Sequence, residues 1–217
     1  MDSCLREFLE SYIDLIDQNQ FDELYAEAKE SLGHEYIADL TNLLYEADID
    51  PVNYFKKELP PYFLSGDEDI QTFEFSSNQT HITDIGPRAF EGCINLKTFW
   101  IPSHIKEICY SAFDGCINLT DVQFIEPSNL YIIDDFAFAS CQSLKELVLP
   151  EGVTTIRSYA FAESGIKKLY LPESVVNIDW CTFDQWRGGI LYIKKDSFIE
   201  KKLSKYPTDH FTIVTYE

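Results

Sequence analysis

The chain has 217 residues, of which 45% are apolar and 15% aromatic, so a packed core is expected rather than disorder. The formal net charge is −20, and residues 1–80 alone carry 19 Asp and Glu against 4 Lys and Arg. A field of this sign repels nucleic-acid phosphates and anionic membrane surfaces, so it argues against both as direct partners and suits a basic protein. Solubility alone would also account for the charge.

Residues 1–57 have the apolar spacing of amphipathic helices. Apolar side chains recur at three- and four-residue intervals in three successive segments, the first of which holds Leu5, Phe8 and Leu9. Gly33 suits the end of the second helix, and Pro51 suits the first position of a short fourth one. The pattern predicts an α-helical N-terminal domain that caps whatever follows it.

The faces opposite these apolar stripes are acidic. They are either solvated surfaces or a docking surface for a cationic partner. The predicted acidic residues are Glu7, Glu10, Asp14, Asp17, Asp22, Glu23, Glu27 and Glu30.

From about residue 58 the period changes, and an Ala-Phe pair recurs after 23, 25, 23 and 22 residues. Its first copy reads AFEGCINLKTFWIP over 89–102, and the worn last copy starts at Thr182. A fixed period in the twenties is the signature of a solenoid. The residues around Phe63 follow the same pattern, so the repeats are predicted over 58–193, as about six coils.

Within each unit, the recurring letters are predicted to be core. Two apolar residues spaced by two, such as Phe99 and Ile101, place both side chains on one face of a strand. A second apolar pair follows the proline that ends each strand. Cys93, Cys116 and Cys141 occupy one repeat position, so packing inside the stack is favoured over a metal or redox role.

The strand residues that point away from this core are the candidate protein-binding residues. In a solenoid they form rows across a concave sheet, and this set includes Trp and Tyr, which dominate binding hot spots. Contact with the chain's own ends or with a second copy would also use such a face. The predicted rows contain Trp100, Gln123, Val148, Tyr170 and Tyr192 in the centre, and Thr98, Asp121, Glu146 and Lys168 beside it.

Residues 194–217 are predicted to close the C-terminal end of the stack. The segment DSFIEKKLSKYP has helical character, and FTIVTYE alternates like a terminal strand. This part also holds the one basic cluster of the sequence, with Lys194 and Lys195 at its start. The overall expectation is an α+β chain with three parts, over 1–57, 58–193 and 194–217.

The repeats resemble the leucine-rich repeats of the BspA type. The resemblance rests on the string A-F-x-G-C-x-x-L followed by alternating apolar residues and proline, in four good copies and two worn ones. The resemblance implies a non-catalytic binding scaffold. Many members of this family are secreted or surface-bound adhesins. The head, with FDELYAEA and then LTNLLYEADIDPVNYF, resembles a segment that precedes such repeats in proteins of gut-bacterial phages, which implies an intracellular product acting on a host component.

The sequence holds no nucleophile elbow, P-loop or dinucleotide fingerprint, and its four His residues are scattered. No enzyme activity, cofactor or metal is therefore predicted. The N-terminus lacks the pattern of a secretory signal, so a cytoplasmic location is expected. The leading hypothesis is an intracellular, phage-encoded inhibitor of a basic host protein, for example a nucleic-acid-processing defence factor. The alternative is an adhesin-like surface protein.

Overall fold

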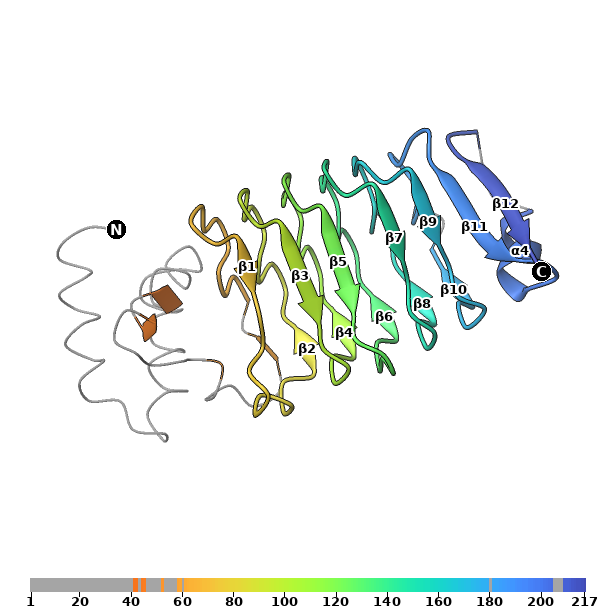
Figure 1. Ribbon diagram of the computed structural model, residues 1–217. Coiled ribbons are helices and arrows are strands. Elements are labelled where there is room, and N and C mark those ends of the chain that lie inside the picture. The colour runs from red at the N-terminus through yellow and green to blue at the C-terminus, as the bar shows by residue number, and fades with distance from the viewer. Residues whose placement is uncertain are drawn as a thin grey trace.

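The computed structural model describes residues 41–42, 44–45, 52, 58–59, 61–179, 181–204 and 209–217. Within these ranges the chain coils into a solenoid, in which each turn contributes one longer and one shorter strand (Figure 1). Most of the predicted helical head, including all of its acidic residues named above, lies outside the described residues.

The longer strands follow the Ala-Phe turns and the shorter ones follow the prolines. The longer set is β1 (Thr72–Phe73), β3 (Thr98–Ile101), β5 (Asp121–Phe124), β7 (Glu146–Val148), β9 (Lys168–Tyr170) and β11 (Ile190–Lys194). The shorter set is β2 (Asp84–Ile85), β4 (Glu107–Ile108), β6 (Ile132–Ile133), β8 (Thr155–Ile156) and β10 (Asn177–Ile178).

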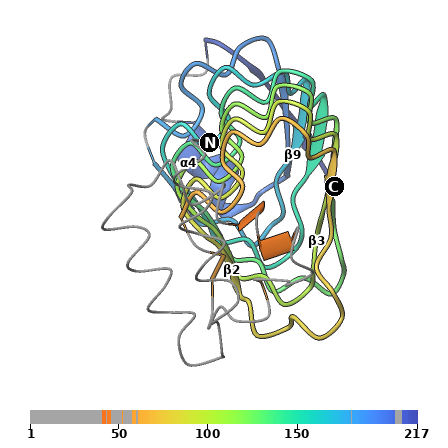
Figure 2. The same ribbon diagram turned by 90° about the vertical axis from the view of Figure 1, so that its left-hand side faces the viewer.

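All strand pairs are parallel, because each strand lies beside its counterpart in the next coil. The shorter strands form one continuous sheet in the order β10-β8-β6-β4-β2. The longer strands form two sheets, β1-β3-β5 and β12-β11-β9-β7. Figure 2, which views the stack end-on, places β3 and β9 on one side of the coil and β2 on another.

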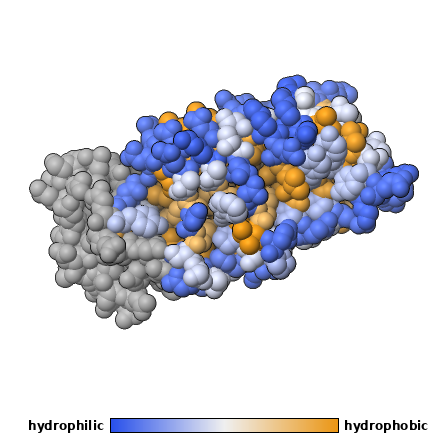
Figure 3. Space-filling view, viewed as in Figure 1, coloured by the Kyte–Doolittle hydropathy of each residue, from blue (hydrophilic) through white to orange (hydrophobic). Residues whose placement is uncertain are grey.

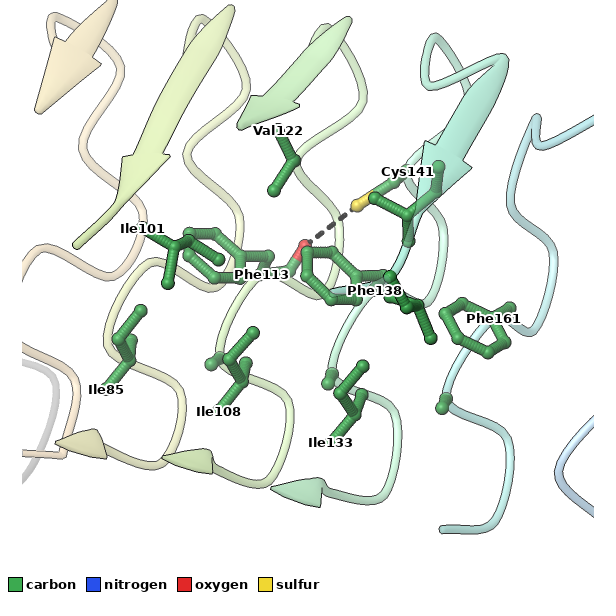
Figure 4. Packing of buried hydrophobic residues seen from close by; sticks show 14 of the residues in the cluster. Ile85, Ile101, Ile108, Phe113, Val122, Ile133, Phe138, Cys141 and Phe161 are labelled. Carbon is green, nitrogen blue, oxygen red and sulfur yellow. Dashed lines mark hydrogen bonds between the residues drawn. The ribbon is translucent and has the colours of Figure 1, made fainter. Parts of the chain in front are cut away.

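The recurring letters form ladders inside the stack, as predicted. The rings of Phe113 and Phe138 lie 5.4 Å apart and nearly parallel, at 5°, and the same spacing separates Phe90 from Phe113. A second ladder of isoleucines follows the shorter strands, from Ile85 to Ile133 (Figure 4). These Phe and Ile side chains are fully buried. At about 25 cal/mol per Å² of apolar surface, such ladders supply the main stabilising free energy of the fold.

Each coil turns through left-handed corners on either side of its Phe. In the first two Ala-Phe units, the residue two positions after the Phe is a glycine. Gly92 and Gly115 occupy this corner with φ of 69° and 74°, which glycine adopts without steric strain. In later coils the same corner holds Ser140, Glu163 and Gln185, with φ between 53° and 62°. These side chains carry a conformational cost that the packed neighbours must offset.

From Phe90 onwards, two coils differ in length from the others, at different places. The coil that contains β5 has two more residues between Phe124 and its proline than the corresponding segment after Ile101. The coil that contains β9 has one residue fewer between its Phe and its anchor, Ile166. Gly165 lies at this shortened corner, and a Cβ there would come 1.9 Å from the carbonyl oxygen of Gln142.

A helix and a strand cover the C-terminal end, as predicted. Helix α4 (Phe198–Leu203) begins at Ser197, whose hydroxyl accepts a hydrogen bond from the Glu200 N–H, and it buries Ile199 and Leu203. The helix is shorter than the sequence pattern indicated. Strand β12 (Thr212–Tyr216) then pairs with β11 over its full length. The boundaries at 57 and 193 remain predictions.

Candidate functional site

The residues predicted to face outward lie side by side on the longer strands. We call the exposed side of β1, β3, β5, β7, β9, β11 and β12 the long-strand face. In register, Trp100 lies beside Gln123, and Val148 lies beside Tyr170. Trp100 is 45% exposed and Val148 is 57% exposed, whereas their strand neighbours Phe99 and Leu147 are buried. Figure 3 views this face and shows hydrophobic side chains scattered among hydrophilic ones.

The structure places the predicted residues in register on neighbouring strands, but in two groups, and their role in binding stays a prediction. One group spans β3 and β5, and the other spans β7, β9 and β11. Their paired positions are Thr98 with Asp121 and Trp100 with Gln123 in the first group, and Glu146 with Lys168 and Val148 with Tyr170 and Tyr192 in the second. The expectation of one continuous sheet is wrong between β5 and β7.

A groove of about 770 Å³ opens where the two groups separate. We call it the β5–β7 groove. Its walls come from β5, from β7 with the chain that follows it, and from the tyrosines Tyr170 and Tyr216. Four carboxylates line it, on Asp121, Glu126, Glu146 and Glu151, against one ammonium group, that of Lys145. The Lys145 ammonium donates a hydrogen bond to the Gln142 carbonyl oxygen at 2.6 Å. This bond holds the ammonium group at the corner before β7.

Charges and rings on the second group are paired across neighbouring strands. Lys168 Nζ lies 3.4 Å from Glu146 Oε2, and the negative charge of Glu146 raises the pKa of Lys168. Both side chains are about half exposed, so solvent screens the pair and it adds little to stability. The rings of Tyr170 and Tyr192 stack 4.4 Å apart at 9°, which makes a flat aromatic surface beside the groove.

A second row of rings, which sequence analysis missed, lies at the corner between the shorter strands and the Ala-Phe turns. We call it the outer ridge. The Arg88 guanidinium lies 5.6 Å from the ring centre of Tyr62 and 5.2 Å from that of Tyr110. The row continues through Phe136 to Tyr159, with ring centres 6.0 Å and then 5.0 Å apart. The signal was present in the letters just before each Ala-Phe pair, PRAF, YSAF, DFAF and SYAF.

The three repeated cysteines are packing residues. Cys93, Cys116 and Cys141 are fully buried, and each thiol donates to a backbone carbonyl oxygen of the preceding coil, at 2.9 to 3.2 Å. Burial raises the pKa of Cys93 to about 12, so its reactive thiolate is scarce. Among the described residues, no group of three or more His, Cys, Asp or Glu side chains gathers as a metal site would require.

The comparisons with known proteins agree with the repeat architecture of the chain. The model of the BspA type leucine rich repeat region matches residues 57–188 in six copies. The chain belongs to this family. No match is found among curated proteins. Within the described part of this BspA-type protein, no helix is long and apolar enough to cross a membrane.

A solved structure with a TM-score above 0.5 shows the same fold at low sequence identity, and two further structures are similar with lower scores. A leucine-rich repeat protein from Bacteroides ovatus matches with a TM-score of 0.52 and 19% identity, over 76% of this chain and 46% of that one. The pneumococcal vaccine antigen PcpA matches with a TM-score of 0.49 and 17% identity, over 75% of this chain and 45% of that one. A leucine rich cell surface protein from Faecalibacterium prausnitzii matches with a TM-score of 0.45 and 23% identity, over 63% of this chain and 42% of that one. The chain therefore spans less than half the length of each.

Proposed function

We propose that the chain is a non-catalytic protein-binding module, and that its long-strand face binds a basic protein. The observation that carries the proposal is that large side chains on the long-strand face are open to solvent, with Trp100 and Val148 exposed and Tyr170 partly exposed. Solubility does not require an exposed Trp and neighbouring Tyr side chains, whereas binding hot spots are rich in both. The excess of carboxylates on the chain favours a cationic partner, which it would attract over a distance.

The more specific version of this proposal is an intracellular, phage-encoded inhibitor of a nucleic-acid-processing host protein. It is supported by the acidic residues of the head and by the resemblance of that segment to phage proteins. Neutralising Glu7, Glu10, Asp14 and Asp17 together should then abolish binding to such a target. An unchanged affinity for the target would exclude the acidic head as a phosphate mimic.

Affinity capture with the full chain tests the binding face. The variant Trp100→Ala/Tyr170→Ala should lose the captured basic protein, because each hot-spot truncation costs about 2 kcal/mol or more. Tyr110→Ala, which removes a ring from the outer ridge, is the matched control and should retain it. If the double variant captures the same proteins and the control loses them, the outer ridge is the binding face. Sedimentation of the chain alone would reveal a homodimer that uses the long-strand face.

A further inference from the structure

The β5–β7 groove separates two strand edges that elsewhere in the solenoid would be paired. On β5, the Asp121 N–H donates to the Lys97 carbonyl oxygen, towards β3, at 3.2 Å. On the other side, the Leu149 N–H donates to the Tyr170 carbonyl oxygen, towards β9, at 3.1 Å. Alternate residues of a parallel strand bond to opposite neighbours, so the backbone groups of Val122 on β5 and of Val148 on β7 face the groove.

No backbone hydrogen bond joins β5 to β7 in the described part of the chain. The coils themselves stay together elsewhere. The Ser143 N–H donates to the Ile117 carbonyl oxygen at 3.1 Å, and the shorter strands β4, β6 and β8 remain paired across the same interval. The separation is therefore confined to the long-strand face. Open backbone groups along a strand are a template for a further extended segment.

The size and charge of the groove select the kind of segment. A volume of about 770 Å³ lies within the range of specific ligand pockets, about 300–1,000 Å³, so it fits a short stretch of chain rather than a domain. Among the described residues, the carboxylate of Glu151 forms no direct ion pair, although Glu173 and, more weakly, Glu151 raise the pKa of Lys194. The carboxylate of Glu146 is shared with an exposed lysine. The rings of Tyr170 and Tyr216 add faces that attract cations.

We propose that the β5–β7 groove binds an extended segment of the partner protein and admits one of its Arg or Lys side chains. A backbone carbonyl of the segment accepts a hydrogen bond from the Val148 N–H at the open edge of β7, and its cation lies among Glu146, Glu151 and the tyrosine rings. This proposal rests on the proposed function, because it names the part of the partner that the long-strand face recognises.

A synthetic peptide tests the proposal without knowledge of the partner. The probe is a short capped peptide of alternating threonine and valine with a central arginine, and its binding to the full chain is followed by NMR titration. The same peptide with citrulline or glutamate in place of arginine should bind at least about tenfold more weakly, since it lacks the charge. Equal binding of the three peptides, or no binding of the arginine peptide at millimolar concentration, would overturn the proposal.

Two variants separate backbone recognition from charge recognition. Val148→Pro removes an N–H that faces the groove and leaves the pairing of β7 with β9 in place, so it should weaken the arginine peptide about tenfold. Val148→Thr keeps the N–H and the branched shape, so the difference in binding between Val148→Pro and Val148→Thr measures the contribution of the N–H. Glu146→Gln/Glu151→Gln should weaken binding about tenfold, while Glu74→Gln, at an exposed position outside the groove, should not. Peptide binding that survives either groove variant contradicts the assignment.

The partner protein distinguishes this proposal from the proposed function. A basic partner that is lost by Trp100→Ala/Tyr170→Ala but kept by Val148→Pro would leave the binding face in place and refute the role of the groove. A partner that all of these variants retain would refute both.

Discussion

The thiol of Cys141 donates a hydrogen bond to the backbone carbonyl oxygen of Phe113, with Sγ 3.2 Å from the oxygen (Figure 4). The bond joins one coil to the one before it, beside the stacked rings of the two Ala-Phe units. Cys116 and Cys93 repeat it in the preceding coils. The cysteine of the repeat therefore serves both as an apolar filler and as a link between coils.

Replacing Cys141 by Ala should lower the free energy of unfolding by about 1–3 kcal/mol, because the change removes both a buried hydrogen bond and packed volume. Urea unfolding followed by circular dichroism measures the loss. Cys181→Ala is the matched control, since that side chain is only half-buried, and it should cost less than about 1 kcal/mol. Equal losses in the two variants would show that the link adds nothing.

The buried thiols should also make the fold sensitive to alkali. Burial raises the pKa of Cys93 to about 12, whereas an unfolded thiol has a pKa near 8.5. Below about pH 8.5 both states are protonated and the contribution to stability is complete. Above it the unfolded state releases the proton first, so stability falls by about 1.4 kcal/mol per pH unit until the pKa of the folded state is reached.

Denaturant unfolding at about pH 8 and about pH 10 measures this alkaline loss, and Cys93→Ala should reduce it by about 2 kcal/mol. The same burial predicts that, of the cysteines the structure describes, half-buried Cys181 reacts first with a thiol reagent in the folded protein. Early labelling of Cys93 would contradict both expectations.

Two glycines should respond differently to alanine. Gly165→Ala places a Cβ 1.9 Å from the Gln142 carbonyl oxygen, so the corner must move, and we expect a loss of about 3 kcal/mol or more, or failure to fold. At Gly115, the nearest atoms to such a Cβ lie 3.6 Å away, and only the left-handed backbone opposes it. Gly115→Ala should cost about 1–2 kcal/mol. Thermal unfolding of the two variants measures the difference, and the reverse order would refute the clash at Gly165.

Ser164 occupies the repeat position that the cysteines hold, but in the shortened coil. Its hydroxyl oxygen is buried without a hydrogen-bond partner among the described residues, so it carries a desolvation cost that a bond does not offset. Ser164→Ala should therefore leave stability unchanged or raise it by up to about 1 kcal/mol. A loss larger than 1 kcal/mol in urea unfolding would indicate that the hydroxyl does find a partner in solution.

The core could be predicted because it repeats. Phe90, Cys93 and Leu96 recur at fixed spacing, and each position faces its own copy in the next coil, so one unit determines the place of the rest. The pairing of Trp100 with Gln123 followed from the same spacing. The neighbours of a repeated position can be predicted from the repeat alone, without knowledge of distant contacts. For this reason the strands and the register of the rows could be assigned from the sequence.

The groove and the outer ridge could not be predicted in this way. The groove lies beside two additional residues after Phe124, and the missing pairing of β5 with β7 is visible only in three dimensions. The outer ridge depends on letters that do not repeat, since Arg88 and Phe136 occupy equivalent corners with different chemistry. Their rings and charge meet only because the coils stack.

The longer coil after β5 suggests how a repeat protein acquires a new specificity. Its additional residues correspond to Ile125 and Glu126, which lie on the surface and leave the Phe and Ile ladders intact. Deleting these two residues should restore the common interval, allow β7 to pair with β5 and close the opening. A change in the length of one turn, with every buried side chain retained, would then be enough for evolution or a designer to open or seal a recognition slot at any chosen coil.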